Sequence, residues 1–345
     1  MRPSTYRRFD DGTEAKLAFL TQPAAYADAT RKVECVETHM AWVFLTDRHA
    51  FKLKKPVRYD FLDFSTVEAR REDGAREIAL NRRLAPDVYL DLVPLTVDAG
   101  GRLALAGDGE TLDWLVKMRR LPREQMLDWQ LEHGNPTADE LRPAALLMAG
   151  FYRNADALAV APQTYLSDLH KAVQENTAAL SLPDYALPAE VLGRISDGQL
   201  RFLDDQGELL RERARAGHIV EGHGDLRPEH ICLTDPPVVI DCLEFNREFR
   251  IVDPVDELAF LTLECHVLGS AWAGELFLEI YCEITGDRPA SRLFEFYKSQ
   301  RALLRAKLAA WHLRDSEIAD AEKWLRRASV YLTLASDFLG RALEA

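Results

Sequence analysis

Two short stretches of this 345-residue sequence combine side-chain types that could do chemistry. The first, GHGDLRPEHICL at 222–233, contains two His, an Asp, a Glu and an Arg. The second, VVIDCLEF at 238–245, places Asp241 at the end of an apolar run. Burying a carboxylate without a partner costs several kcal/mol of folding free energy. We therefore expect Asp241 to leave a buried strand and enter a polar site.

The pair Asp225 and Asp241 matches what phosphoryl transfer requires. One carboxylate has to accept or orient the proton of the attacking hydroxyl. A second has to hold Mg²⁺ on the nucleotide phosphates, because hard cations prefer oxygen ligands. We assign the first role to Asp225 and the second to Asp241. The apolar residues 238–240 would form the strand that carries Asp241.

Taken together, HGDLRPEHI and VVIDCLEF resemble the catalytic and metal-binding segments of the aminoglycoside phosphotransferase-like family, which has the protein-kinase-like fold. The resemblance is best over 219–262. It implies an α+β, bilobal protein-kinase-like fold with a small β-rich N-lobe at 1–118 and a large, mainly helical C-lobe at 119–345. The C-lobe would carry the catalytic loop 222–233 and the metal-binding strand end 238–245.

The family pattern implies a lysine that contacts the nucleotide phosphates, and AFKLKKP at 50–56 offers three. On a strand, Lys52 and Lys54 share one face with Ala50, because side chains alternate. We favour Lys52, since the small Ala50 two residues before it leaves room for adenine. Lys52→Met should then impair transfer and Lys54→Met should not. The alternative is that these lysines only keep an edge strand soluble.

The resemblance also implies contacts on a helix and on a later strand. Glu77, in REIALNRRL at 76–84, is expected to pair with the phosphate lysine; the alternative is an acid on a solvated helix face. In WLVKMRRL at 114–121, backbone groups near Val116 and Met118 are expected to meet the adenine edge.

The sequence departs from the family pattern at two places. VETHMAWVFL precedes AFKLKKP where a Gly-rich loop is expected. Either the backbone of 38–41 covers the phosphates without glycines, or nucleotide binding is weak. His230 takes the position of a metal-binding Asn; it would bind metal, donate to phosphate or pack. Imidazole is a poor ligand for Mg²⁺ and a better one for Mn²⁺. Glu244 would supply a further metal oxygen or lie in an exposed loop.

The sequence indicates less clearly which residues hold the catalytic loop in place. His223 is expected to hold the loop by hydrogen bonding. The acid that buttresses this loop in the family falls among Asp253, Asp256 and Glu257. Glu257 takes the position of the usual Asp, which leaves the identity of the anchor open.

The remaining pattern predicts the elements that position these residues. AWVFL and AFKLK form a hairpin through TDRH, and a second hairpin turns at 99–101. A helix follows DFS at 63–65, with Ser65 and Glu68 as its capping box. TLDWLVKMRRLP reads as a strand, and helices follow at about 137–160, 164–181, 187–215 and from 254 onward. The segment 219–245 interrupts these helices as a β island.

Composition limits the class of protein. With 47% hydrophobic residues and a net charge of −13, the chain is a globular protein without a nucleic-acid partner. No apolar run is long enough to span a membrane. The polar N-terminal residues and five scattered cysteines without a C-x-x-C motif predict a reduced, cytoplasmic protein.

We therefore expect a kinase that uses ATP and Mg²⁺, with Mn²⁺ as the alternative metal, and phosphorylates a hydroxyl of a small molecule. Residues 1–118 hold 18 Lys and Arg against 19 Asp and Glu, and the remainder 25 against 37, which suits a cationic acceptor such as an amino sugar. The alternatives are a catalytically silent nucleotide-binding protein of this fold, a protein kinase and a metal-dependent phosphohydrolase. The oligomeric state stays open.

Overall fold

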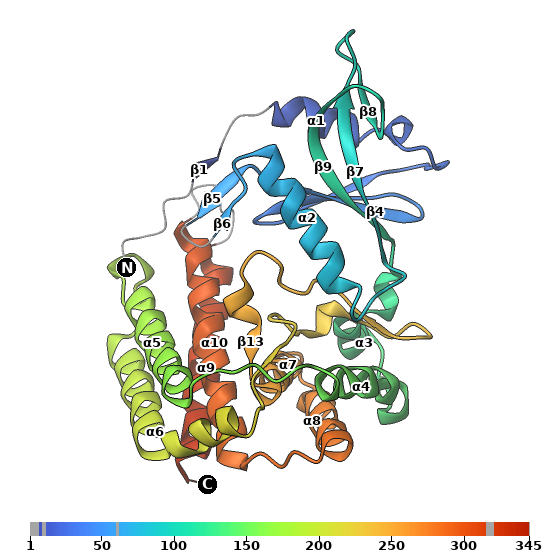
Figure 1. The fold of residues 1–345 in the computed structure, drawn as a ribbon. Helices are drawn as coiled ribbons and strands as arrows, with labels where there is room; N and C mark the ends of the chain where they lie inside the picture. Colours follow the sequence, from blue (N-terminus) through green and yellow to red (C-terminus); the bar gives the residue numbers. More distant parts are fainter. Residues whose placement is uncertain (1–6, 9–11, 60–61, 315–320, 345) are drawn as a thin grey trace. The chain divides into compact units, whose positions relative to one another are not determined.

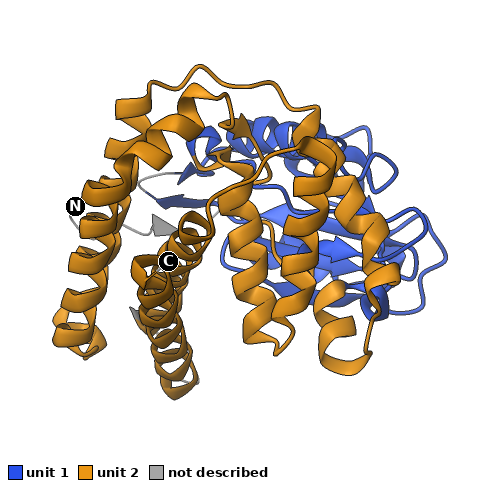
Figure 2. Cartoon of the chain, turned by 90° about the horizontal axis from the view of Figure 1, so that it is seen from below, with its two compact units in different colours: residues 1–126, 230–248 blue, residues 127–229, 249–345 orange. Residues whose placement is uncertain are grey.

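The computed structural model describes residues 7–8, 12–59, 62–314 and 321–344, which form two compact units. Figure 2 colours them separately: unit 1 comprises residues 1–126 and 230–248, and unit 2 comprises residues 127–229 and 249–345. Residues 230–248, which the sequence assigns to the helical C-lobe, belong to unit 1.

Unit 1 contains a six-stranded antiparallel sheet with the strand order β2-β3-β4-β9-β7-β8 (Figure 1). Its strands are β2 (Glu34–Glu37), β3 (Ala41–Leu45), β4 (His49–Lys54), β7 (Tyr89–Val97), β8 (Leu103–Leu105) and β9 (Glu110–Arg119). The two predicted hairpins are confirmed as β3–β4 and β7–β8, and the strand predicted from TLDWLVKMRRLP is β9. Because β9 pairs with both β4 and β7, it lies inside the sheet.

The other elements of unit 1 are short, apart from one helix. They are β1 (Arg7–Arg8), α1 (Thr13–Leu20), η1 (Pro23–Ala25), β5 (Val57–Tyr59), β6 (Leu62–Asp63), α2 (Val67–Asn81), η2 (Arg123–Gln125), β11 (Ile231–Cys232) and β12 (Val238–Val239). Strands β1, β5 and β6 form a separate three-stranded sheet.

Helix α2 packs on one face of the large sheet, against β7 and β9 (Figure 1). It approaches closely at Gly74, where an added Cβ would lie 2.7 Å from Leu92 Cδ1. The helix begins one residue later than predicted, because Thr66 is its N-cap and accepts a hydrogen bond from the Ala69 N–H at 3.1 Å. The predicted capping box at Ser65 is therefore wrong, since the Ser65 hydroxyl instead donates to Asp63.

The two faces of β4 have different surroundings. Phe51 and Leu53 point into a buried core of the sheet with Phe44, Leu95 and Leu115. Lys52 and Lys54 lie on the opposite face and form ion pairs with side chains of α2. The alternation predicted from AFKLKKP is therefore present, and it directs both lysines toward the helix.

The segment 230–248 joins unit 1 through backbone and apolar contacts. The Leu233 N–H donates to the carbonyl of Gln125 at 2.8 Å. Strand β11 pairs with β12, and Cys232 and Val238 pack in the same buried cluster as Val116. These contacts bring Asp241, which follows β12, to the helix α2 side of unit 1.

Unit 2 is mainly helical. Its elements are α3 (Leu127–His133), α4 (Ala138–Arg153), α5 (Pro162–Leu180), η3 (Pro183–Tyr185), α6 (Ala189–Arg215), β10 (Val220–Glu221), β13 (Ile251–Val252), α7 (Pro254–Val267), α8 (Ala271–Thr285), α9 (Ser291–Trp311), η6 (His312–Arg314) and α10 (Ala321–Glu344). The turns η4 (Pro228–His230) and η5 (Arg247–Arg250) cross the unit boundaries.

The helices of unit 2 pack largely in antiparallel pairs, with α5 beside α6 and α9 beside α10 (Figure 1). Helix α4 ends at Arg153, before the predicted 160, because the chain then runs beside β10: Ala157 bridges to Val220, and the Leu158 N–H donates to the carbonyl of Ile219 at 2.8 Å. Within the described part of the chain, no helix has the length and apolarity required to span a membrane.

Candidate active site

Three of the predicted site residues meet in unit 1. Lys52 Nζ lies 2.8 Å from Glu77 Oε1 and 3.0 Å from Asp241 Oδ1. Glu77 is fully buried, whereas the Asp241 side chain is 45% exposed. Burial alone would lower the pKa of the Lys52 ammonium, but the charges of Asp241, Glu77 and Glu244 outweigh it and raise that pKa well above its ordinary value. Lys52 is thus a fixed cation beside an accessible carboxylate.

The backbone of Asp241 has an unusual conformation. Its φ is +60°, in the left-handed region, which costs a residue with a side chain about 1–2 kcal/mol. Three hydrogen bonds hold this turn: Ile240 N–H to the carbonyl of His230 at 2.9 Å, Asp241 N–H to the Tyr89 hydroxyl at 3.0 Å, and Cys242 N–H to Asn81 Oδ1 at 2.8 Å. Strained backbone that its surroundings fix in this way clusters at functional sites.

Sequence reasoning missed Asn81 and Tyr89. Asn81 ends α2, four residues after Glu77, and its Nδ2 donates to the Glu77 carbonyl at 2.9 Å. It therefore links the helix that carries Glu77 to the segment that carries Asp241. A buried amide one turn after Glu77 was the available signal, because the two positions share one helix face. Tyr89 gave no comparable signal.

His230 lies beside Asp241 rather than apart from it. Its Nε2 is 3.5 Å from Asp241 Oδ2, and the residue is buried. This contact with the Asp241 carboxylate differs from the three predicted roles of His230, which are binding metal, donating to phosphate and packing. Over the described ranges, no three or more His, Cys, Asp or Glu side chains are grouped so that they could hold a metal ion.

Lys54 occupies a second, more deeply buried set of ion pairs. Its Nζ lies 2.7 Å from Glu77 Oε2 and 2.8 Å from Asp73 Oδ2, and it also contacts Glu244 Oε1. Burial, opposed by the charge of Lys54, raises the pKa of Glu244 to about 7. Glu244, a predicted metal ligand, is thus paired with a lysine in the interior and does not lie in an exposed loop.

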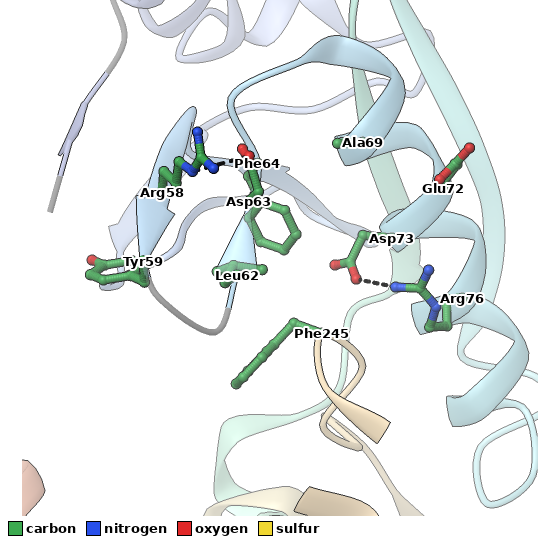
Figure 3. Close-up of a pocket in the computed structure, with 10 residues that line it drawn as sticks. All are labelled: Arg58, Tyr59, Leu62, Asp63, Phe64, Ala69, Glu72, Asp73, Arg76 and Phe245. Carbon is green, nitrogen blue, oxygen red and sulfur yellow. Dashed lines mark hydrogen bonds and ion pairs between the residues drawn. The ribbon is translucent and has the colours of Figure 1, made fainter. Parts of the chain in front are cut away.

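A cavity of about 300 Å³ adjoins these ion pairs (Figure 3). Its lining residues are Arg58, Tyr59, Leu62, Asp63, Phe64, Ala69, Glu72, Asp73, Arg76 and Phe245. Asp73 belongs both to this wall and to the Lys54 group, and Arg76 Nη1 binds its other oxygen at 2.9 Å. The cavity therefore ends at the residues that surround Lys54.

Val116 and Met118 lie on the same face of the sheet as Lys52, because they pair with Lys52 and Ala50 across the β4–β9 ladder. Tyr89 and Leu92 of β7 flank them on the other side. A central strand uses its backbone groups in the two ladders. An adenine at these two positions would accordingly meet side chains. Met118, Leu121 and Ile240 are partly buried and pack against the same buried cluster.

The turn between β2 and β3 replaces a Gly-rich loop. The Thr38 N–H and hydroxyl both donate to the Ala41 carbonyl, at 2.8 and 2.9 Å, and the Ala41 N–H donates to the Thr38 hydroxyl at 3.0 Å. The Met40 carbonyl accepts from the Lys55 N–H at 2.8 Å. A threonine side chain thus fixes this turn, and the N–H groups of Thr38 and Ala41 are already engaged.

In unit 2, Glu257 anchors the predicted catalytic loop. Its carboxylate accepts hydrogen bonds from the N–H of His223 at 2.9 Å and from the N–H of Gly224, and from the Tyr152 hydroxyl at 2.9 Å. An added Cβ at Gly222 would overlap the same carboxylate, so only glycine fits there. Burial raises the pKa of Glu257 more than these hydrogen bonds lower it. Of the three acids considered, Glu257 is the one that contacts the loop backbone.

Asp225 is held from both sides within the loop. Its N–H donates to His223 Nδ1 at 3.3 Å, and its Oδ2 lies 2.9 Å from Arg227 Nη2. Arg227 also binds Glu229 through Nη1, at 2.5 Å. The predicted role of His223 in holding the loop agrees with this hydrogen bond, and Arg227 is the residue next to the Asp225 carboxylate.

A buried ion pair fixes the start of α7, the helix that carries Glu257. Asp253 is its N-cap and accepts from the Val255 N–H at 2.9 Å. Arg213 of α6 binds both oxygens of Asp253 at 2.7 Å and Asp287 at 2.7 Å. Bidentate contacts of this kind are rigid as well as strong. The loop anchor therefore rests on a fixed helix start, and Arg213 had no recognisable signal in the sequence.

No protein-family model matches the chain. Uncharacterised proteins from Mycobacterium tuberculosis and Mycobacterium bovis are 33% identical to it over 310 residues, which is 88% of this chain and 60% of each relative. The chain therefore spans about three fifths of the length of the curated relatives that it matches.

Solved structures are similar over almost the whole chain. The GDP and kanamycin complex of APH(2″)-IIia has a TM-score of 0.52 and 16% identity, covering 94% of this chain and 98% of that one. A choline/ethanolamine kinase family protein from Mesorhizobium loti has a TM-score of 0.51 and 16% identity, covering 97% of this chain and all of that one. The GDP complex of wild-type aminoglycoside 2′-phosphotransferase-IIIa has a TM-score of 0.50 and 16% identity, covering 96% and 99%. The chain thus has the protein-kinase-like fold in the form found in aminoglycoside phosphotransferases, with a β-rich N-terminal part and a helical C-terminal part.

Proposed function

We propose that this protein is an ATP-dependent phosphotransferase that moves the γ-phosphate to a hydroxyl group of a small molecule. The observation that carries the proposal is the arrangement of Lys52, Glu77 and Asp241, with Asp241 held in a left-handed backbone conformation beside the lysine. A buried glutamate that fixes a lysine, next to a partly exposed carboxylate, supplies both a cation for phosphate oxygens and a ligand for a divalent metal.

The residues present fit Mg²⁺ bound with a nucleotide. Mg²⁺ is usually held by one or two carboxylates together with phosphate oxygens and water, so a complete cage of protein ligands is not needed. Asp241 would hold it, whereas Glu244 is occupied by Lys54. When bound, the metal would neutralise charge on the phosphates. His230 would orient Oδ2 of Asp241, since its Nε2 lies 3.5 Å from that oxygen.

The protein's own residues would then bind, orient and accept a proton. Lys52 would bind phosphate oxygens. Asp225 would accept the proton of the acceptor hydroxyl as that oxygen bonds to the γ-phosphorus and the bond to the β–γ bridging oxygen breaks. Arg227 would keep the Asp225 carboxylate in place, and Glu257 would fix the backbone of the loop. ADP and the phosphate monoester are the products.

We propose an acceptor that carries a positive charge. The acidic balance of residues 119–345 favours such a ligand. One of the similar structures is a complex with kanamycin, which is an amino sugar, and another is a choline/ethanolamine kinase family protein. Because ATP and small metabolites occur there, we propose that the protein acts in the cytoplasm.

The experiment is a screen for nucleotide consumption. Amino sugars and amino alcohols are supplied as acceptors with ATP or GTP, because two of the similar structures contain GDP, and with Mg²⁺ or Mn²⁺. We expect acceptor-dependent release of the diphosphate that is lost in Asp225→Asn. Nucleotide binding without transfer to any acceptor would instead support a catalytically silent protein. Hydrolysis of phosphate esters without nucleotide would support a phosphohydrolase.

A further inference from the structure

Lys54, the less favoured of the two lysines on sequence grounds, contacts the same glutamate as Lys52. We propose that Lys54 is a positioning residue: it holds Glu77 from one side, so that Glu77 can fix Lys52 from the other. This inference rests on the proposed function, because the position of Lys52 matters only if Lys52 binds phosphate.

The two oxygens of Glu77 are divided between the two lysines. Oε1 lies 2.8 Å from Lys52 Nζ, and Oε2 lies 2.7 Å from Lys54 Nζ. Lys52 and Lys54 stand two residues apart on one face of β4, and Glu77 is fully buried between α2 and that strand. A carboxylate bound at both oxygens cannot rotate about its last bond without losing one ion pair. The direction in which Oε1 points is therefore set by Lys54.

Lys54 is itself fixed by residues other than Glu77. It pairs with Asp73 at 2.8 Å and with Glu244, and its ammonium lies 5.2 Å from the centre of the Phe64 ring. Arg76 binds the second oxygen of Asp73 at 2.9 Å. Only 3% of the Lys54 side chain is exposed, against 16% for Lys52. Lys54 is therefore enclosed by protein groups, and the more exposed Lys52 is the lysine suited to bind a ligand.

Removing the Lys54 ammonium would take away a counterion that three carboxylates share. Asp73, Glu77 and Glu244 all contact this one group. Like charges in a medium of low polarity repel strongly, and a buried charge without a partner is unfavourable. Glu77 would then turn or shift away from its neighbours, and Lys52 would lose its fixed partner. Lys54→Met should thus impair transfer, in contrast to the expectation from the sequence.

The test compares Lys54→Met with Lys54→Arg, which keeps the charge, and with Lys16→Met. Lys16 is an equally buried lysine of unit 1 that pairs with Asp113 at 2.8 Å and is distant in sequence from both β4 and α2. We expect Lys54→Met to lower kcat by about 10- to 100-fold, as is typical when a residue that orients a site group is lost. The KM of the acceptor should stay within about two-fold, because no acceptor contact is removed.

The two comparison variants separate positioning from general destabilisation. Lys54→Arg should recover part of the lost kcat, and Lys16→Met should lower the melting temperature without lowering kcat. Should Lys54→Met fail to fold, the double variant Asp73→Asn with Lys54→Gln removes one charge of each sign and should show the same loss of kcat. Unchanged kcat in Lys54→Met or in the double variant would overturn the proposal.

A structure of Lys54→Met, or of the double variant, tests whether Lys54 positions Glu77 without any measurement of activity. We expect the distance from Glu77 Oε1 to Lys52 Nζ to exceed about 4 Å, the limit for an ion pair. If that distance stays at the 2.8 Å of the unmodified protein, Lys54 does not position Glu77. If the unmodified protein transfers phosphate to no acceptor but this distance increases, the proposed function fails while the role of Lys54 stands.

Discussion

Asp241 enters the candidate site with its backbone in a conformation that few residues with a side chain adopt. Asp and Asn tolerate the left-handed region better than most other residues, because their short polar side chains can bond locally. Here, hydrogen bonds from Asp241 and Cys242 to Tyr89 and Asn81 hold the turn. At the scale of single residues, the position of Asp241 therefore depends on two buried side chains, Tyr89 and Asn81.

Tyr89→Phe tests one of these groups. It removes the acceptor of the Asp241 N–H at 3.0 Å and keeps the buried ring. An unsatisfied backbone N–H should cost about 1 kcal/mol of unfolding free energy, and nucleotide affinity should fall because Asp241 is less fixed. Tyr26→Phe is the matched control, since its buried hydroxyl donates to the Leu20 carbonyl at 2.6 Å, away from the site. Urea unfolding and nucleotide titration of both variants check this. Equal nucleotide affinity in the two variants would refute the role of Tyr89.

Part of the site could be predicted from the sequence, because it follows from patterns among neighbouring residues. Lys52 and Lys54 follow from the alternation of one strand, and Asp241 follows from an apolar run that ends in an acid. Asn81 and Tyr89 could not be found in this way, because their partners lie 161 and 152 residues away in the chain. Only the folded arrangement shows that these residues share a task.

At the scale of elements, each unit positions its candidate site residues by packing a helix against a strand or a loop. In unit 1, α2 supplies Asp73 and Glu77 one turn apart, and β4 supplies two lysines on the facing side. In unit 2, α7 places Glu257 against the backbone of the predicted catalytic loop. The N-cap of α2 is Thr66 and not the predicted Ser65, because the Ser65 hydroxyl bonds to Asp63. When two neighbouring residues both carry a hydroxyl, the sequence does not show which of them will cap the helix.

Glu257→Gln should loosen the catalytic loop. Glutamine offers one carbonyl oxygen where the carboxylate accepts from both His223 N–H and Gly224 N–H. Losing one such bond costs about 2 kcal/mol, which corresponds to roughly a 30-fold loss of kcat. Nucleotide affinity should change little, because the proposed phosphate contacts lie in unit 1. Tyr152→Phe removes only the hydroxyl that donates to Glu257 and should have a smaller effect. Steady-state kinetics that rank the two variants in the opposite order would contradict this anchor.

Glu244→Gln should change how stability depends on pH. Burial raises the pKa of Glu244 from an ordinary 4.5 to about 7 in the folded state. A carboxyl with a raised pKa contributes most to stability below its unfolded value, and the contribution is lost as the pH rises through the folded value. Relative to Glu244→Gln, the unmodified protein should therefore lose on the order of 3 kcal/mol between pH 4.5 and pH 8.

Urea unfolding without metal, at several pH values, measures this difference. Glu264→Gln is a useful comparison, because that buried acid of unit 2 is bound by Arg305 and by the Tyr331 hydroxyl, away from Lys54. A difference between Glu244→Gln and the unmodified protein that is constant with pH would show that Glu244 is ionised throughout this range.

At the scale of the whole molecule, the order of segments along the chain differs from their grouping in space. Residues 230–248 interrupt the helical part in sequence but pack in unit 1, through contacts with Gln125, Met126 and Leu84. The sequence predicts a domain boundary near residue 118, because the strand pattern ends there. Contacts between residues this far apart in the sequence leave no local pattern. The fold could therefore be predicted from the resemblance to a family and not from composition.

The claim that the site in unit 1 binds a metal–nucleotide complex is tested most directly by calorimetric titration of ATP with and without Mg²⁺, in the unmodified protein and in Asp241→Asn. Asparagine keeps the size of the side chain and tolerates the left-handed backbone, so the exchange removes the charge and little else. We predict that Mg²⁺ strengthens ATP binding to the unmodified protein and that this gain is lost in Asp241→Asn. An equal gain from Mg²⁺ in both proteins would contradict the assignment of Asp241 and, with it, the proposed site.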